Sequence, residues 1–192
     1  MKIIASRVEK SRRLPGDELI DDPQGRVTYA ITIDASPAEI FPWLKQMGCQ
    51  RAGWYSYDRL DNGGKPSAER IIPELQQVEV GDYFPATPND PPGSGFRVTD
   101  IKENKYLLLS TFSRLPSMQP VEAGEQPEKY WRTTWLFFLE PLEKRRTRLI
   151  VRNNLGYKPR WVGIPANLMI LPIHFIMQRR QLLNIKERAE GR

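Results

Sequence analysis

Apolar and polar side chains alternate with a period of two near the start of the chain. Over residues 27–33, every second side chain is large and apolar, the pattern of a β-strand with one buried face. The apolar positions are Val27, Tyr29, Ile31 and Ile33. Before this strand, residues 1–24 are polar and contain Pro and Gly at turn-like positions. We therefore predict an N-terminal arm over 1–24 and a single domain over 25–192.

A short helix is predicted directly after this strand. Ser36 suits the N-cap, Pro37 the first helical position and Glu39 the third, which together form a capping box. The apolar residues that follow share one face at helical spacing: Ile40, Trp43, Leu44 and Met47. Gly48 supplies a stop.

Beyond Gly81 the chain is rich in β-branched and aromatic residues, which favours antiparallel strands. Strands are predicted over residues 96–101, 106–112, 131–140 and 147–155. Alternation along the third of these predicts which side chains face the interior: Trp131, Thr133, Trp135, Phe137 and Leu139. The opposite side is more polar, and we expect Arg97 and Arg152, in the polar phase of their strands, to be solvated.

A long helix of roughly 25 residues is predicted to end the chain, starting near Pro165. Its first half, residues 164–177, is apolar nearly all round, so we expect it to be buried on more than one side. It is shorter than the about 20 apolar residues of a membrane span, and Pro172 interrupts it. This element order predicts an α+β fold with a curved antiparallel sheet around the helix, and a hollow between them suits a ligand.

Composition and charge narrow the function classes. The chain has 192 residues, 40% of them hydrophobic, which is typical of a globular protein. The net charge of +6 is concentrated at the two ends. A solvated basic face and weak contact with an anionic membrane surface are both compatible with it, whereas no nucleic-acid motif accompanies it.

Metal, disulfide and targeting signals are sparse. The chain has one cysteine, Cys49, and one histidine, His174. We therefore expect no intrachain disulfide, no zinc site built from several such ligands and no cofactor. The start of the chain lacks the apolar run of a signal peptide, so we expect a cytoplasmic location.

Several segments resemble a known family. Residues 43–48, WLKQMG, and 51–58, RAGWYSYD, resemble the N-terminal signature of a bacterial branch of the polyketide cyclase/START-like superfamily. These SRPBCC proteins are related to the birch pollen allergen. Weaker agreement extends the resemblance over about residues 14–190, at Ile71–Glu74, Gly81–Asp82, Glu140–Leu142 leading into Thr147–Leu149, and Met177–Glu190. The resemblance implies a helix-grip fold, with two short helices after the first strand and a deep hydrophobic cavity. It carries over no catalytic residue.

Seven residues are candidates for binding a ligand in that cavity: Trp54, Tyr55, Tyr57, Phe96, Trp131, Trp135 and His174. Trp and Tyr combine an apolar ring with one polar handle. The alternative is that these rings form ordinary core or pin the first helices onto the sheet. His174 is either a hydrogen-bonded structural residue or, if it faces the cavity, a group suited to acid–base work.

Three functions stay open. The leading hypothesis is binding or carrying a small hydrophobic or amphipathic molecule, such as a lipid, an isoprenoid or an aromatic polyketide. The second is a polyketide cyclase or dehydratase in which His174, Tyr55 or Tyr57 moves protons. The third is an interaction module for proteins or a membrane surface that uses the basic, apolar terminal helix. Two long loops, 85–95 and 113–129, are candidates for lids or for tolerated insertions.

Overall fold

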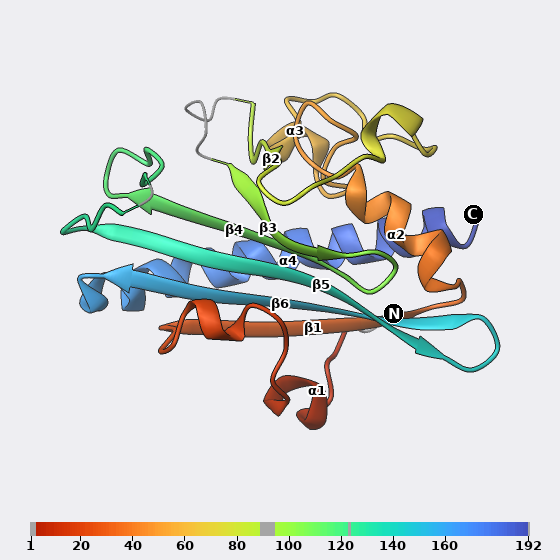
Figure 1. The fold of residues 1–192 in the computed structure, drawn as a ribbon, viewed down its shortest axis with the longest axis horizontal. Coiled ribbons are helices and arrows are strands. Elements are labelled where there is room, and N and C mark those ends of the chain that lie inside the picture. Colours follow the sequence, from red (N-terminus) through yellow and green to blue (C-terminus); the bar gives the residue numbers. More distant parts are fainter. Residues whose placement is uncertain (1–2, 89–94, 123, 192) are drawn as a thin grey trace.

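A six-stranded antiparallel sheet, in the order β1-β6-β5-β4-β3-β2, forms the body of the computed structural model (Figure 1). The structure describes residues 3–88, 95–122 and 124–191. The helices are α1 Arg7–Ser11, α2 Pro37–Lys45, α3 Asp58–Asp61 and α4 Gly163–Ala189, with short 3-10 turns η1 Asp17–Leu19, η2 Pro73–Leu75 and η3 Arg160–Val162. The strands are β1 Gly25–Ile33, β2 Tyr83–Phe84, β3 Phe96–Lys102, β4 Tyr106–Arg114, β5 Tyr130–Leu142 and β6 Arg146–Lys158. The predicted helix-grip architecture, with two short helices after the first strand, is confirmed.

The long hairpin of β5 and β6 is the centre of the sheet. Its pairing runs without interruption from Leu142 opposite Arg146 to Tyr130 opposite Lys158. Trp135, Phe137 and Leu139 of β5 pack on the face that carries the main core, as the alternation predicts. Because side chains alternate along a strand, the neighbouring residues of β5 must point to the other face of the sheet.

The main core fills the space between one face of the sheet, α2 and the C-terminal half of α4. Leu182 and Ile185 of α4 are fully buried there. Polar side chains also hold this half of the helix: Asn184 donates to the Tyr55 carbonyl at 2.8 Å, and Lys186 donates to the Thr32 carbonyl at 3.0 Å. The capping box of α2 is present, and the Ser36 backbone N–H donates to the Glu39 carboxylate at 2.8 Å.

The N-terminal arm covers the opposite face of the sheet. Ala5 and Leu14 of the arm form a second buried cluster with four side chains of the sheet: Ala30, Leu108, Leu136 and Ile150. Two ion pairs fasten the arm at its edges, Arg12–Glu140 at 2.8 Å and Glu9–Arg148 at 2.7 Å. Much of the face predicted to be polar is therefore buried.

Arg152 of β6 lies beneath this arm, and the expectation that it is solvated is wrong. Its side chain is 1% exposed. Its guanidinium donates to the Asp17 carboxylate at 2.6 Å and to the backbone carbonyls of Glu9 at 2.6 Å and Arg12 at 2.9 Å. Arg97, by contrast, is exposed as predicted. The period-two pattern places both residues on the outer face but does not show that the arm covers one of them.

The N-terminal half of α4 departs most from expectation. It was predicted to be buried on more than one side, yet its large apolar side chains face solvent, among them Leu168, which is 75% exposed. Asn167 links it to the arm and to β6: its side chain donates to the Gln24 carbonyl at 2.9 Å and accepts from the Tyr157 hydroxyl at 3.3 Å. Among the described residues, Arg160–Ala189 is the one helical segment long and apolar enough to cross a membrane.

Replacing Arg152 with leucine should destabilise the fold strongly. Arg152→Leu takes from the buried Asp17 carboxylate its closest cation and from several arm carbonyls a hydrogen-bond donor, and breaking a buried ion pair typically costs about 3–5 kcal/mol. Urea unfolding followed by tryptophan fluorescence measures this change. Arg97→Leu is the matched control on an exposed strand position, with an expected change within about 0.5 kcal/mol. Equal effects of the two substitutions would contradict the burial of Arg152.

Candidate functional site

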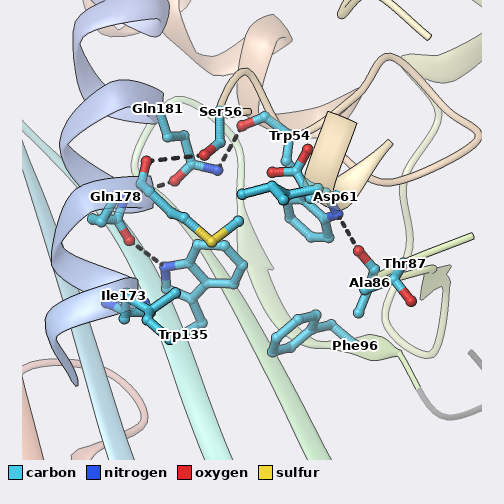
Figure 2. A pocket seen from close by; sticks show the side chains of 13 residues that line it. Trp54, Ser56, Asp61, Ala86, Thr87, Phe96, Trp135, Ile173, Gln178 and Gln181 are labelled. Carbon is cyan, nitrogen blue, oxygen red and sulfur yellow. Dashed lines mark hydrogen bonds between the residues drawn. The ribbon is translucent and has the colours of Figure 1, made fainter. Parts of the chain in front are cut away.

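A cavity of about 660 Å³ lies where the exposed half of α4 rises from the sheet (Figure 2). Its walls come from α3 and α4, from β3 and β5, and from the loops that precede α3 and β3. The lining residues are Trp54, Ser56, Leu60, Asp61, Ala86, Thr87, Phe96, Trp135, Ile173, His174, Met177, Gln178 and Gln181.

Three aromatic rings form the floor of the cavity. The ring of Trp54 stacks on that of Trp135 with centroids 5.1 Å apart, and Phe96 lies 5.8 Å and 5.2 Å from the two tryptophan rings. A tight turn holds Trp54 in place: Gly48 and Gly53 exchange two backbone hydrogen bonds of 3.1 Å and 3.0 Å. Gly53 has φ of 80°, and an added Cβ there would meet the Ser67 hydroxyl at 2.2 Å, so glycine is required.

Most polar atoms at the cavity wall are satisfied by one another. Trp135 donates from Nε1 to Gln178 at 3.0 Å, Gln178 donates to Gln181 at 2.6 Å, and Gln181 donates to the Trp54 carbonyl at 2.9 Å (Figure 2). Trp54 donates from its own Nε1 to the Ala86 carbonyl at 2.9 Å. Because these groups are already paired, they present little polarity to a ligand.

The carboxyl group of Asp61 is an exception. Asp61 ends α3 and is 5% exposed, and neither of its carboxylate oxygens has a hydrogen bond of full geometry with a described residue. The Ser56 hydroxyl and the backbone N–H groups of Tyr57 and Asp61 nevertheless lie close enough to lower its pKa in part. The Ser56 hydroxyl also donates to the Met177 carbonyl at 3.2 Å, and the Ser67 hydroxyl donates to the Asp58 carboxylate at 2.5 Å. Burial, together with the neighbouring Asp58 carboxylate, raises the pKa of Asp61 to about 6.

His174 is the second polar group left to the cavity. Its ring stacks on Tyr29 at 5.9 Å and meets the edge of Trp135 at 6.1 Å, and its Nδ1 has no hydrogen-bond partner among the described residues. Burial lowers the pKa of His174 to about 4. The imidazole is therefore neutral near pH 7, with one nitrogen that donates and one that accepts.

Trp54, Phe96, Trp135 and His174, four of the seven predicted residues, line this cavity. The other three do not. Tyr55 points into the main core, where its hydroxyl accepts from Gln46 at 2.8 Å and burial raises its pKa. Tyr57 is exposed and borders a separate shallow hollow, and Trp131, on the same face of β5 as Trp135, lies outside the lining. A role of the four lining residues in ligand binding stays a prediction.

Sequence reasoning missed Asp61 and the side chains that form the cavity wall from α4. Asp61 follows the aromatic run by three residues and carries no periodic signal, because α3 has a single turn. Of the two loops proposed as lids, loop 85–95 contributes Ala86 and Thr87 to the lining, although its residues 89–94 lie outside the described part of the chain. Among described residues of loop 113–129, none lines the cavity.

Metal chemistry receives no support from the donor set of this site. Within residues 3–88, 95–122 and 124–191, no group of three or more His, Cys, Asp or Glu side chains is placed to hold an ion. Asp61 and His174 are the two lining residues of these types, and burial affects them in opposite ways: it raises the pKa of the acid and lowers that of the base. What the site offers chemically is an aromatic enclosure with Asp61 and His174 in its wall, where their carboxylate oxygens and Nδ1 are buried.

Comparisons with known proteins support the fold. No family model matches the chain, and no curated protein matches it either. A hypothetical protein from Helicobacter pylori aligns over 98% of this chain and 99% of its own, with 12% identity and a TM-score of 0.50. At that identity the likeness supports the fold alone.

Two further solved structures have lower TM-scores. A conserved protein from Geobacillus kaustophilus shares 14% identity, with 87% of this chain and 96% of its own covered and a TM-score of 0.46. A point mutant of norcoclaurine synthase from Thalictrum, in complex with a transition-state analogue, shares 12% identity over 87% and 94%, with a TM-score of 0.45. We draw no functional conclusion from either.

Asp61→Asn should stabilise the protein at alkaline pH. Below about pH 4 the carboxyl is protonated in both the folded and unfolded chain, so it costs nothing. As the pH rises through the folded pKa of about 6, the folded protein must hold a buried charge. The substitution removes that cost, and we expect a gain of about 1–3 kcal/mol at pH 8 and little change at pH 4. Urea unfolding at the two pH values measures it. The exposed Asp22→Asn is the control, and an equal gain for Asp61→Asn at both pH values would argue against the raised pKa.

His174→Phe should show the opposite dependence. The folded protein binds the histidine proton only near pH 4, whereas the unfolded chain binds it near pH 6.5. The contribution of neutral His174 to the free energy of unfolding is therefore fully present above pH 6.5 and is lost as the pH falls through 4. Phenylalanine keeps the stacking on Tyr29 and takes up no proton, so the variant should gain about 1–2 kcal/mol over wild type between pH 8 and pH 4. A constant difference across that range would show that His174 titrates alike in both states.

Proposed function

We propose that this protein binds a small, mainly apolar molecule that carries a hydrogen-bond donor, and that it does so in the cavity between α4 and the sheet. One observation carries the proposal. The cavity of about 660 Å³ has an aromatic floor, and its polar wall groups are paired with one another except for Asp61 and His174. That combination of an apolar enclosure with a few unpaired polar atoms is typical of small-molecule sites.

The size and lining of the cavity define the ligand's body. A volume of about 660 Å³ is within the range of pockets for drug-sized molecules. The three rings of the floor suit an aromatic or isoprenoid body, because flat faces and edges pack closely with it. Removing about 300 Å² of apolar ligand surface from water contributes about 7 kcal/mol before the cost of association.

Asp61 and His174 define the ligand's polar group. Above pH 6 the Asp61 carboxyl is largely ionised and can only accept hydrogen bonds. A ligand hydroxyl or amine directed at it would give this carboxylate a hydrogen bond of full geometry, which the described residues do not supply, and the neutral His174 would contribute a second contact. A carboxylate at the same place would be repelled. We therefore include hydroxylated or amino-substituted aromatic and isoprenoid compounds in the ligand class and exclude fatty acids bound by their head group.

A cavity-filling substitution tests binding directly. Ala86→Phe should lower affinity for N-phenyl-1-naphthylamine, a neutral aromatic probe with one N–H donor, by about tenfold or more, because the new ring occupies the enclosure. Fluorescence titration measures the affinity. Ala38→Phe, at an exposed position of α2 outside the lining, should leave affinity unchanged. Equal affinities of both variants and wild type would place the probe elsewhere and overturn the proposal.

A second candidate function is acid–base catalysis on such a ligand, and the raised pKa of Asp61 is the observation that favours it. A carboxyl with a pKa of about 6 inside an apolar site suits a general base near neutral pH. Tyr55 and Tyr57 do not serve this reaction, since neither lines the cavity.

The two functions are separated by what the protein retains from a cell extract. Native mass spectrometry of wild type and Asp61→Asn, purified side by side, gives the mass of any bound molecule. A carrier of cytoplasmic apolar molecules would retain the same molecule in both, more weakly in the variant. An enzyme would retain a different molecule in the variant, namely the unconverted substrate.

A further inference from the structure

The exposed half of α4 forms an apolar surface that nothing in the described chain covers. We define this apolar helix surface by its large side chains: Trp161, Ile164, Leu168, Met169, Ile173 and Ile176. Trp161 and Ile164 are each 70% exposed, and Leu168 is 75% exposed. Residues 161–176 at 1.5 Å each extend about 24 Å along the helix axis. A contiguous surface of this kind on a protein marks an interaction site.

Cations stand at both ends of the apolar helix surface. Lys158 and Arg160 precede it, and Arg179 and Arg180 follow it, all with exposed side chains. The chain contains no Asp or Glu between Glu143 and Glu187. Asp22 pairs with Arg160 at 3.0 Å, and the other three cations have no ion pair among the described residues. An apolar stripe flanked by exposed cations, three of them without an ion pair among the described residues, complements a bilayer interface that carries anionic lipids.

The mouth of the cavity adjoins this surface. Ile173 belongs to both, because it lines the cavity and remains 54% exposed (Figure 2). On the other rim, Leu60 lines the cavity and also projects into solvent. A bilayer surface that contacts the apolar helix surface would therefore also contact the mouth of the cavity.

We propose that the apolar helix surface docks on the surface of a bilayer that contains anionic lipids, with α4 lying in the interfacial plane. The helix does not cross the bilayer, since its C-terminal half is packed in the core around Leu182 and Ile185. Docking itself follows from α4 alone. Its role in passing a ligand between lipid and cavity rests on the proposed function.

A second copy of the chain is the competing occupant, and charge disfavours it. If two such helices packed side by side, in either direction, the cationic end of one would face a cationic end of the other. Like charges opposite each other at an interface cost free energy. An anionic lipid surface instead neutralises both ends at once.

Vesicle flotation of the full chain tests the proposal. Vesicles of phosphatidylcholine with phosphatidylglycerol are compared with phosphatidylcholine alone, at low and at high salt. We expect flotation with the anionic vesicles at low salt and a marked loss with neutral vesicles. Arg179→Gln with Arg180→Gln should reduce binding to anionic vesicles about tenfold at low salt and approach wild type at high salt, because the lost attraction is screened.

The apolar contribution has its own variants. Leu168→Gln with Met169→Gln keeps helix propensity and should reduce vesicle binding about tenfold or more. Val8→Gln, at a position 71% exposed in α1, is the matched control and should bind as wild type does. Neither Leu168 nor Met169 lines the cavity, so affinity for N-phenyl-1-naphthylamine should be unchanged in the double variant. Loss of vesicle binding with intact probe binding therefore supports docking separately from the proposed function.

Three results would overturn the proposal. The first is that wild type does not float with anionic vesicles, and the second is that wild type and both double variants float equally. The third is that wild type binds no vesicles but sediments as a dimer, which Leu168→Gln with Met169→Gln dissociates. The last result would assign the apolar helix surface to a second copy of this chain.

Discussion

The close packing of α4 on the main core along its C-terminal half is the constraint on which the rest of the structure depends. Leu182 and Ile185 are fully buried, and Asn184 and Lys186 bond to backbone carbonyls of the loop after α2 and of β1. From Gln178 toward the helix N-terminus the cavity and its aromatic floor lie beside the helix, which keeps only scattered contacts such as His174 on Tyr29 and Asn167 with Gln24. One helix cannot fill a curved sheet along its whole length, so a hollow and an exposed helix face arise together.

The contacts between the N-terminal arm and the outer face of the sheet stabilise the fold away from the cavity. The arm buries Leu14 against Leu136 and Ile150, and Arg152 joins arm and sheet through several hydrogen bonds. A fold held by two buried clusters tolerates an unpaired carboxyl such as Asp61 at its open end. Such local costs are common where a site must leave groups free for a ligand.

Much of the fold could be predicted from the sequence, because it depends on local periodicity. The alternation in β1 and β5 and the capping box at Ser36 each depend only on residues a few positions apart in the sequence. The burial of Arg152 and the exposure of Leu168 depend instead on which distant segment lies over them. An apolar helix reads the same in sequence whether a protein, a bilayer or water surrounds it, so pattern alone led to the wrong environment.

In the candidate site, too, some residues could be predicted from the sequence and others could not. Trp54, Phe96, Trp135 and His174 were within reach of prediction, since aromatic residues on inward-facing positions tend to line whatever the sheet encloses. Tyr55 was not, because its positive φ of 58° turns the side chain away from the cavity and into the core beside Gln46. Asp61 was also out of reach, since its importance comes from the absence of a partner, which only the assembled structure reveals.

The cavity and the apolar helix surface impose related demands on a ligand. A molecule that reaches Asp61 from a bilayer must leave hydrocarbon, pass Ile173 and keep its donor unpaired until it meets the carboxylate. A strongly charged molecule would not enter from lipid, because an ion pays a large desolvation cost there. A purely apolar molecule would leave Asp61 unsatisfied and gain less from the cavity than from the bilayer. An amphipathic molecule with a single hydroxyl or an uncharged aromatic amine avoids both penalties, so we expect the ligand to belong to this class.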